Sequence, residues 1–316
     1  MSAMPRPPGS WTDDELRHDA AEARQRFVAE RLAALADEQR DYRSLVNQYA
    51  ATARELLKAS ADLRDLTGAV LSNREFLSLA RYLAVPMISI DDLDTLTDSC
   101  FGLWVEQKTD QGVRPSDDDL DAAARIIGER LDEDRAPWLR SGTTPTSFER
   151  ETFIYGIAAI RAASRLVTSR RTARSKQQEA ATRQAVAAAS YLPVKLPGTI
   201  DDPVAEMPSG TYSSQSRKLA GTNMDVPIRL HDRHPTGQLF LAVECKASNS
   251  TLNSRKRLLE VNSKKDTWDT SGLPHRFRTA ALLAGVFDVK RLAEAQNSGV
   301  YIFWEHRLSD LTDFLK

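Results

Sequence analysis

The stretch Leu239-Phe240-Leu241-Ala242-Val243-Glu244-Cys245-Lys246 decides the fold of the C-terminal half of this chain. Its run of apolar residues predicts a central strand that is packed on both faces. Because side chains alternate across a strand, Glu244 and Lys246 share one face and Cys245 lies on the other. A carboxylate and an ammonium are costly at the end of a buried strand unless a metal, a partner or a substrate needs them.

A second short strand is expected just upstream, at residues 225–230, with Asp225 at its start. Asp…Glu-x-Lys on two neighbouring strands is typical of Mg²⁺-dependent cleavage of phosphodiesters, because Mg²⁺ prefers a few carboxylate oxygens. In this interpretation Asp225 and Glu244 bind the metal, and Lys246 orients the attacking water and stabilises charge in the transition state. The alternative is structural: Glu244 and Lys246 form an ion pair and Asp225 caps a turn.

Another Glu-x-Lys sequence, at residues 106–108, follows the apolar stretch 101–105. Apolar residues around it recur at three- and four-residue steps, which predicts a helix. Because residues i and i+2 of a helix point in different directions, Glu106 and Lys108 are not expected to share a site. The strand at 239–246 is therefore the better candidate.

Composition limits the class of protein. A chain of 316 residues can bury a full core and is expected to form two domains. No apolar stretch approaches the length of a membrane span, and the N-terminus lacks a signal-peptide core. The two cysteines, Cys100 and Cys245, make no disulfide framework, and Cys245 is expected to be a small buried hydrophobe. The sequence thus predicts a cytoplasmic protein without a membrane partner, and the lack of a G-x-x-x-x-G-K-[ST] sequence excludes a P-loop motor.

Charge is distributed unevenly along the chain. Residues 1–135 hold 17 Lys/Arg against 27 Asp/Glu, whereas residues 136–316 hold 26 against 17. The net charge is therefore −10 in the first part and +9 in the second. A basic part that contains the Asp…Glu-x-Lys frame suggests contact with a polyanion, although scattered arginines on solvated helix faces explain the count equally well.

The organisation predicted from the patterning is a helical domain at 1–145 and a mixed α/β domain at 146–316, in which helices flank a mixed sheet. Thr12 begins a capping box that opens the first helix, and Ser116 and Ser250 are expected to cap further helices. The Ala/Arg-rich segment 147–190 is too long for a usual globular helix, so we expect a break around Thr168–Thr172. Further strands are expected at 281–287 and 300–304, with a helix between them at 288–296.

Two basic segments flank the predicted strands. Glu179 is the only acid between Glu151 and Asp201 and lies within a strongly basic helix. Such a Glu is more often a surface ion-pair partner, and its functional interpretation is an outer-sphere metal ligand that reaches the metal through water. Other residues of these segments are suited to contacts with DNA phosphates or base edges. The alternative is that they are ordinary helix caps and solvated helix faces. They are Arg170, Arg171, Arg174, Lys176, Asn249, Ser250, Asn253, Arg255, Lys256 and Arg257. His306 has no recognisable partner in the sequence.

Several ordered blocks of the C-terminal half resemble XamI-type type II restriction endonucleases of the PD-(D/E)xK superfamily. The blocks are SRRTARSKQQEAATRQAV (169–186), GTNMDVPIRLHD (221–232), AVECKASNSTLNSRKRL (242–258), ALLAGVF (281–287) and GVYIFWEHRLSDL (299–311). The resemblance covers about residues 145–316. The proline that precedes the aspartate in the superfamily motif is replaced here by Met224, which weakens the motif without removing it.

The resemblance implies Mg²⁺-dependent cleavage of double-stranded DNA at a short sequence, with Mn²⁺ as a substitute metal. It places the superfamily's Asp on Asp225, its Glu on Glu244, its Lys on Lys246 and its helix glutamate on Glu179. It further implies 5′-phosphate and 3′-hydroxyl ends, a homodimer, and a separate DNA methyltransferase in a prokaryotic restriction–modification system directed against phage. A structure- or damage-directed nuclease and a non-catalytic DNA-binding module are the alternatives. The N-terminal half is expected to serve dimerisation or target recognition.

Overall fold

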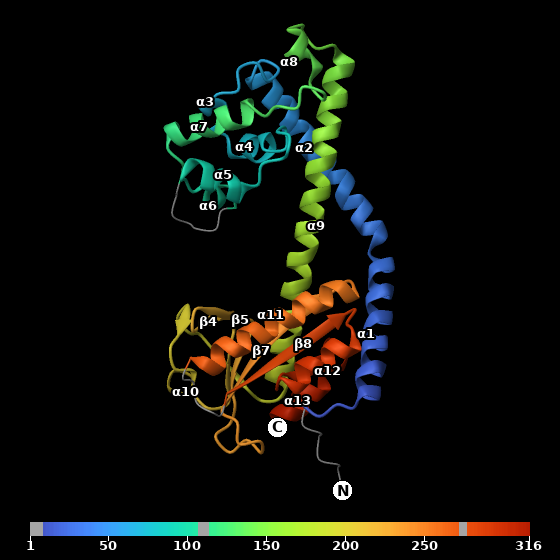
Figure 1. Ribbon diagram of the computed structural model, residues 1–316, viewed down its shortest axis with the longest axis vertical. Helices are drawn as coiled ribbons and strands as arrows, with labels where there is room; N and C mark the ends of the chain where they lie inside the picture. Colours follow the sequence, from blue (N-terminus) through green and yellow to red (C-terminus); the bar gives the residue numbers. More distant parts are fainter. Residues whose placement is uncertain (1–8, 107–113, 272–276) are drawn as a thin grey trace. The chain divides into compact units, whose positions relative to one another are not determined.

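The computed structural model describes residues 9–106, 114–271 and 277–316, which form two compact units. One unit combines the described residues up to Ala34 with those from Arg170 onward, and the other consists of the described residues between Leu35 and Ser169 (Figure 1). This division differs from the expected boundary at 145/146. The first helix packs with the C-terminal sheet, and the helical unit continues into the long helix α9 (Ser147–Ala188).

The C-terminal unit is built on a mixed sheet, as the sequence predicts. Among the described residues this sheet has six strands in the order β1-β3-β6-β7-β8-β9. β6 and β7 are antiparallel, whereas β7, β8 and β9 are parallel to one another. The strands are β1 (Leu192–Val194), β3 (Thr211–Ser213), β6 (Val226–Arg229), β7 (Phe240–Ser248), β8 (Phe277–Gly285) and β9 (Tyr301–Trp304).

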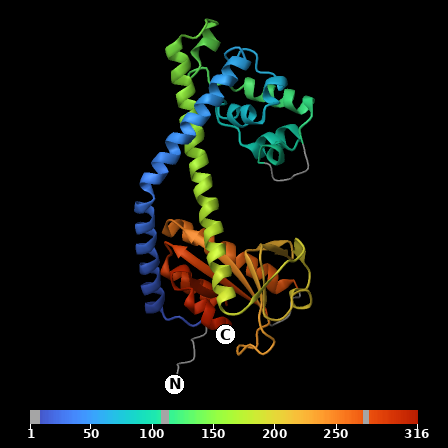
Figure 2. The same cartoon turned by 180° about the vertical axis from the view of Figure 1, so that it is seen from behind.

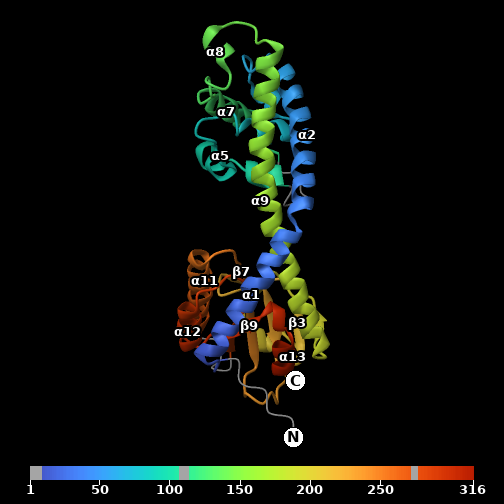
Figure 3. The same cartoon turned by 90° about the vertical axis from the view of Figure 1, so that its right-hand side faces the viewer.

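Helices cover both faces of this sheet (Figures 2 and 3). On one face, Val186 of α9 and Phe314 of α13 (Ser309–Leu315) pack against Leu241 and Val243 of β7. On the other face lie α1 (Asp13–Ala33), α11 (Thr251–Thr270) and α12 (Val289–Asn297). β7 is therefore a central strand that is buried from Phe240 to Cys245, which its apolar run predicts.

Two caps predicted from the sequence position helices of this unit. The side chain of Thr12 accepts a hydrogen bond from the Glu15 backbone in a capping box that begins α1. Ser250 accepts one from the Asn253 backbone and begins α11 directly after β7. Both predictions are confirmed. The first turn of α11 thus follows the end of the central strand.

A small sheet lies beside the start of β7. Within the described chain it has three strands, β2 (Thr199–Ile200), β4 (Arg217–Leu219) and β5 (Thr222–Met224), and α10 (Pro203–Glu206) follows β2. Its apolar residues join those of β7 and α11 in one cluster around Trp268. The indole of Trp268 donates a hydrogen bond to the Leu219 carbonyl at 3.1 Å. This packing fixes the end of β5, after which the chain enters Asp225.

The helical unit has a core of its own. Its elements are α2 (Leu35–Ala59), α3 (Gly68–Leu71), α4 (Arg74–Ala80), α5 (Ile90–Thr97), α6 (Phe101–Glu106), α7 (Asp117–Gly128), α8 (Pro137–Ser141) and the first part of α9. Ser116 caps α7, as predicted. The helix expected around the second Glu-x-Lys sequence is divided in two, because Asp98 adopts a left-handed conformation at φ 50° that ends α5. Glu106 ends α6, and residues 107 and 108 of the second Glu-x-Lys lie outside the described residues.

The break expected around Thr168–Thr172 is wrong, since α9 is a single helix of 42 residues. Residues 157–188 contain neither glycine nor proline, so nothing in the chain interrupts the backbone hydrogen bonds. Ile157 near one end is buried in the core of the helical unit, and Val186 near the other is buried on the sheet. Packing at both ends therefore stabilises a helix longer than the usual length. No described helix is long and apolar enough to cross a membrane.

Candidate active site

Strand pairing brings Asp225 and Glu244 together. β6 and β7 are antiparallel with Val226 opposite Val243, so the residue before β6 lies beside the residue after Val243. A hydrogen bond fixes this arrangement, because the Cys245 backbone N–H donates to Asp225 Oδ2 at 2.8 Å. The two acids predicted from the sequence therefore lie side by side, with Glu244 in the middle of the central strand rather than at its end.

Lys246 lies between the two carboxylates. Its Nζ is 2.8 Å from Glu244 Oε2 and 3.7 Å from Asp225 Oδ2. Glu244 is fully buried, and the side chains of Lys246 and Asp225 are only 12% and 20% exposed. The structure thus places these three residues in one half-enclosed site, with charge of both signs.

A second lysine enters this site from helix α11. Lys264 Nζ contacts Glu244 Oε2 at 2.5 Å and donates a hydrogen bond to the Asn223 carbonyl at 2.7 Å. The sequence interpretation missed Lys264. A signal was present, because the buried residues Val261 and Trp268 define the sheet-facing stripe of α11 and Lys264 lies on it, three residues after Val261.

Burial and charge perturb the ionisable groups of the site. Burial, together with the nearby charge of Asp225, raises the pKa of Glu244 above its usual value of 4.5. Burial alone lowers the pKa of Lys246, yet the charges of Glu244 and Asp225 outweigh it and raise that pKa above its usual value. Perturbed pKa values of an acid and a lysine in one small site are typical of functional centres.

Glu244 is also the best candidate for a metal ligand. Its Oε2 accepts from both lysines, whereas its buried Oε1 has no hydrogen-bond partner among the described residues. An unpartnered carboxylate oxygen in the interior is costly unless another group occupies that position. Carboxylate oxygens with room for water and phosphate suit Mg²⁺, so Asp225 and Glu244 fit that ion.

Glu179 reaches the site through an arginine that the sequence analysis did not single out. Arg183 Nη2 lies 3.1 Å from Glu179 Oε2 and donates a hydrogen bond to the Asp225 carbonyl at 2.9 Å. Ser175 adds a hydrogen bond to the other oxygen of Glu179 at 3.3 Å. Glu179 therefore contacts the backbone of Asp225 through Arg183, one turn along α9.

Cys245 has the structural role predicted for it. Its side chain is buried on the opposite face of β7, and its Sγ lies 3.4 Å from Thr182 Oγ1. Burial raises the pKa of the thiol well above its usual value, which disfavours the thiolate. Cys245 is therefore no nucleophile.

The residues predicted to contact DNA fall into two groups. Arg174 forms a two-pronged ion pair with Glu305, with one contact of 2.9 Å, and Arg257 pairs with Glu260 at 3.1 Å. Ser250 is the helix cap described above. The exposed members are Arg170, Arg171, Lys176, Asn249, Asn253, Arg255 and Lys256. Arg255, Lys256 and Lys264 also line an open groove along α11, with a volume of about 700 Å³.

A family model described as XamI restriction endonuclease matches residues 61–304. The type II restriction enzyme XamI of Xanthomonas campestris pv. amaranthicola is 30% identical over 256 residues, which cover 79% of this chain and 87% of that enzyme. No solved structure matches the chain. The region matched by the family model contains the paired acids and both lysines.

Proposed function

Because the chain belongs to the XamI restriction endonuclease family, we propose that it cleaves double-stranded DNA at a specific sequence with Mg²⁺ bound by Asp225 and Glu244. One observation carries the proposal: Glu244 is fully buried, has one unpartnered oxygen, and lies beside a second acid and two lysines. Apolar residues at these positions would stabilise the sheet at least as well. These four charged residues therefore serve a purpose other than stability, as they do in nucleases of the PD-(D/E)xK superfamily.

In this proposal the chain supplies positioning and charge. When bound, Mg²⁺ would polarise the scissile phosphate and lower the pKa of a water molecule. Lys246 is close to both acids, so its ammonium can orient the attacking water and stabilise negative charge as it develops. The products would carry 5′-phosphate and 3′-hydroxyl ends. Mn²⁺ can substitute because it accepts the same oxygen ligands.

Glu179 is proposed to act on the metal site without binding the metal directly. Arg183 links its carboxylate to the Asp225 backbone, which fixes the position of Asp225. Glu179 itself would reach the metal only through water, since no group of three ligand atoms within 4.8 Å includes it in the described part of the chain. Its loss is expected to slow cleavage less than loss of Asp225.

The DNA-contacting surface is proposed to include the start of α11 and the basic turns of α9. Arg255 and Lys256 are exposed directly after the active strand, where they can bind phosphates. Asn249 and Asn253 offer amide groups suited to base edges. Arg174 and Arg257 are engaged by Glu305 and Glu260, so we assign them to the structure of the protein.

Cutting two strands at one site favours a homodimer, in which each subunit cuts one strand. We propose that the helical unit contributes to dimer contacts or to target recognition. A separate DNA methyltransferase would protect the host sequence, and the pair would act against phage DNA.

The test is a digest of unmethylated phage DNA by the full-length protein, with Mg²⁺, with Mn²⁺ and with EDTA. Discrete metal-dependent bands are expected, and sequencing of the ends gives the site and end chemistry. The Asp225→Asn variant is expected to bind but not cut DNA. Asp266→Asn, which changes an exposed acid of α11, is the matched control and keeps wild-type activity.

Three results would count against the proposal. A smear or junction-only cleavage indicates a structure- or damage-directed nuclease. Uncut DNA that shifts on a native gel indicates a binding module. Wild-type cleavage by Asp225→Asn overturns the site assignment.

A further inference from the structure

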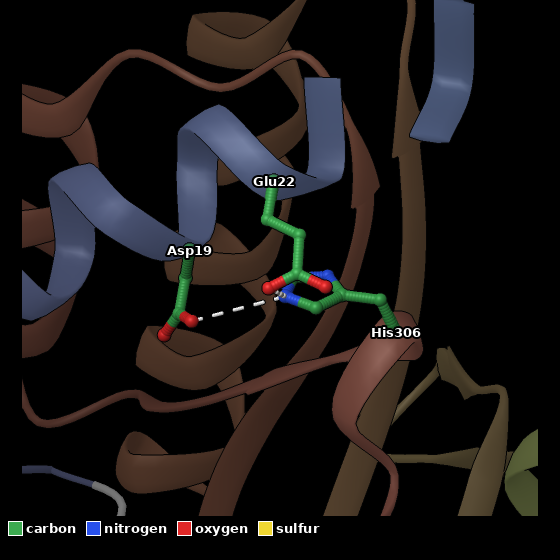
Figure 4. A group of neighbouring side chains, drawn as sticks. All are labelled: Asp19, Glu22 and His306. Carbon is green, nitrogen blue, oxygen red and sulfur yellow. Dashed lines mark ion pairs between the residues drawn. The ribbon is translucent and has the colours of Figure 1, made fainter. Parts of the chain in front are cut away.

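A second cluster of ligand-type side chains lies between α1 and the end of the sheet, all within the C-terminal unit (Figure 4). Asp19 and Glu22 are on successive turns of α1, and His306 is on the short 3-10 helix η1 (Glu305–Arg307) that follows β9. One ligand atom from each of the three residues can be chosen so that all lie within 4.8 Å of one another. No other described residues form such a group.

The atoms of this cluster point at one another without forming hydrogen bonds. His306 Nε2 is 3.8 Å from Asp19 Oδ1 and 3.7 Å from Glu22 Oε2, which is too long for a hydrogen bond. The side chain of His306 is only 5% exposed and that of Asp19 only 1%. Both His306 Nε2 and Asp19 Oδ2 are buried, and neither has a hydrogen-bond partner in the part of the chain that the structure describes. Burying such atoms is costly, and two of them in one place indicate that a further group binds between them.

Arginines hold the two carboxylates in place, and the oxygens that face His306 can still bind an ion, because Glu22 Oε2 is not the oxygen bound by Arg26 and Asp19 Oδ1 keeps a second lone pair. Arg307 Nη1 donates to Asp19 Oδ1 at 2.9 Å, and Arg26 Nη2 donates to Glu22 Oε1 at 2.7 Å. The hydrogen bond from Arg26 lowers the pKa of Glu22 below its usual value, which favours the carboxylate. Second partners of this kind orient the ligands of metal sites.

We propose that Asp19, Glu22 and His306 bind a divalent transition-metal ion of the Zn²⁺ class. Metal–ligand bonds of about 2.0–2.2 Å place two ligand atoms of a tetrahedral ion about 3.3–3.6 Å apart. The separations of 3.7 Å from His306 Nε2 to Glu22 Oε2 and 3.8 Å to Asp19 Oδ1 are close to this spacing. One imidazole nitrogen and two carboxylate oxygens suit Zn²⁺, whereas an all-oxygen set suits Mg²⁺. The ion has a structural role: it joins α1 to η1 and thereby holds the N-terminal helix on the sheet.

Other contacts of α1 indicate why such a link is useful. Trp11, just before the helix, donates its indole N–H to the Ile302 carbonyl of β9 at 2.9 Å. Leu16, Ala20 and Ala23 bury a narrow apolar stripe beside α12 and β9. Val28 and Leu32, further along the helix, are exposed and add nothing to this apolar contact. A bound ion adds a strong link at the middle of this contact.

The experiment measures Zn²⁺ bound to the full-length chain by equilibrium dialysis, after removal of metals with a chelator. The measurements use the Asp225→Asn variant as the background, because this change weakens metal binding at the candidate active site. Cleavage of DNA is assayed separately on the wild-type protein. The expected result is one Zn²⁺ per chain in the background variant and none after addition of His306→Gln. His231→Gln, which changes an exposed histidine, is the matched control and keeps the ion.

Glu22→Gln removes a ligand that is 35% exposed and so tests the site if His306→Gln fails to fold. Zn²⁺ is also expected to raise the Tm of the background variant but not that of the two ligand variants. The proposal is overturned if the background variant binds no Zn²⁺, or if both ligand variants bind as much as their parent. Because the readout is metal content, these results leave the proposed DNA cleavage to its own test.

Discussion

The environment of Glu244 leads to a quantitative prediction for Lys264→Met. In the metal-free protein, Glu244 Oε2 is neutralised by Lys246 at 2.8 Å and by Lys264 at 2.5 Å. Methionine keeps most of the length of the lysine side chain and removes its charge. A hydrogen bond to a charged group contributes about 1.5–3 kcal/mol, and Lys246 remains to limit the loss. The free energy of unfolding is therefore expected to fall by about 2 kcal/mol.

The assay is thermal unfolding followed by circular dichroism in EDTA. A loss of about 2 kcal/mol corresponds to a decrease in Tm of about 4–8 °C for a unit of this size. Lys265→Met is the matched control, because Lys265 is the next residue of α11 and pairs with Asp269, which is 49% exposed. Such a surface pair contributes at most about 0.5 kcal/mol.

Saturating Mg²⁺ provides the second half of this test. A metal bound at Glu244 replaces the lost positive charge, so the difference between Lys264→Met and the wild type should shrink. The reasoning is refuted if Lys264→Met is no less stable in EDTA than Lys265→Met. A difference unaffected by Mg²⁺ would argue against metal binding at Glu244.

Four further predictions concern the same unit. Lys246→Met should reduce the single-turnover cleavage rate by about 10²–10³-fold with little change in DNA affinity in a gel-shift assay, because its charge is needed in the transition state. Arg255→Ala should weaken DNA binding in titrations at several salt concentrations and reduce the salt slope by about 0.9 if one phosphate contact is lost. The raised pKa of Glu244 means that, as pH rises above 4.5, the folded metal-free protein keeps a proton that the unfolded chain loses. The free energy of unfolding, measured in denaturant titrations, should therefore fall as pH rises from 4.5 through the raised pKa. Gly285→Ala should destabilise the protein by at least about 2 kcal/mol in urea unfolding, since an added Cβ lies 2.1 Å from the Ser248 carbonyl oxygen and φ is 92°.

The central strand and its neighbours could be predicted because their pattern is local. The apolar run ending at Glu244 predicts β7, and alternation alone puts Glu244 and Lys246 on one face. The mixed sheet and the caps at Thr12 and Ser250 follow from similar short signals. These predictions needed no knowledge of which distant residues come together.

The remaining features depend on packing between distant parts of the chain. Lys264 meets Glu244 only because α11 folds back along β7, and His306 meets Asp19 across 287 positions of sequence. The continuity of α9 depends on packing in two separate cores, one at each end of the helix. Helix propensities of single residues do not predict such packing. The division into compact units differs from the expected boundary for a related reason: α1 packs on the sheet through its apolar stripe, and the sequence of α1 does not show which part of the chain covers that stripe.

The charges around Glu244 have a consequence for the order in which a complex assembles. Asp225 and Glu244 carry two negative charges and Lys246 and Lys264 two positive charges, so the metal-free site is neutral. A divalent ion entering alone would leave an excess positive charge in a half-buried space. The phosphates of bound DNA supply the matching negative charge. We therefore expect ion and DNA to bind cooperatively, so that each raises the affinity of the site for the other.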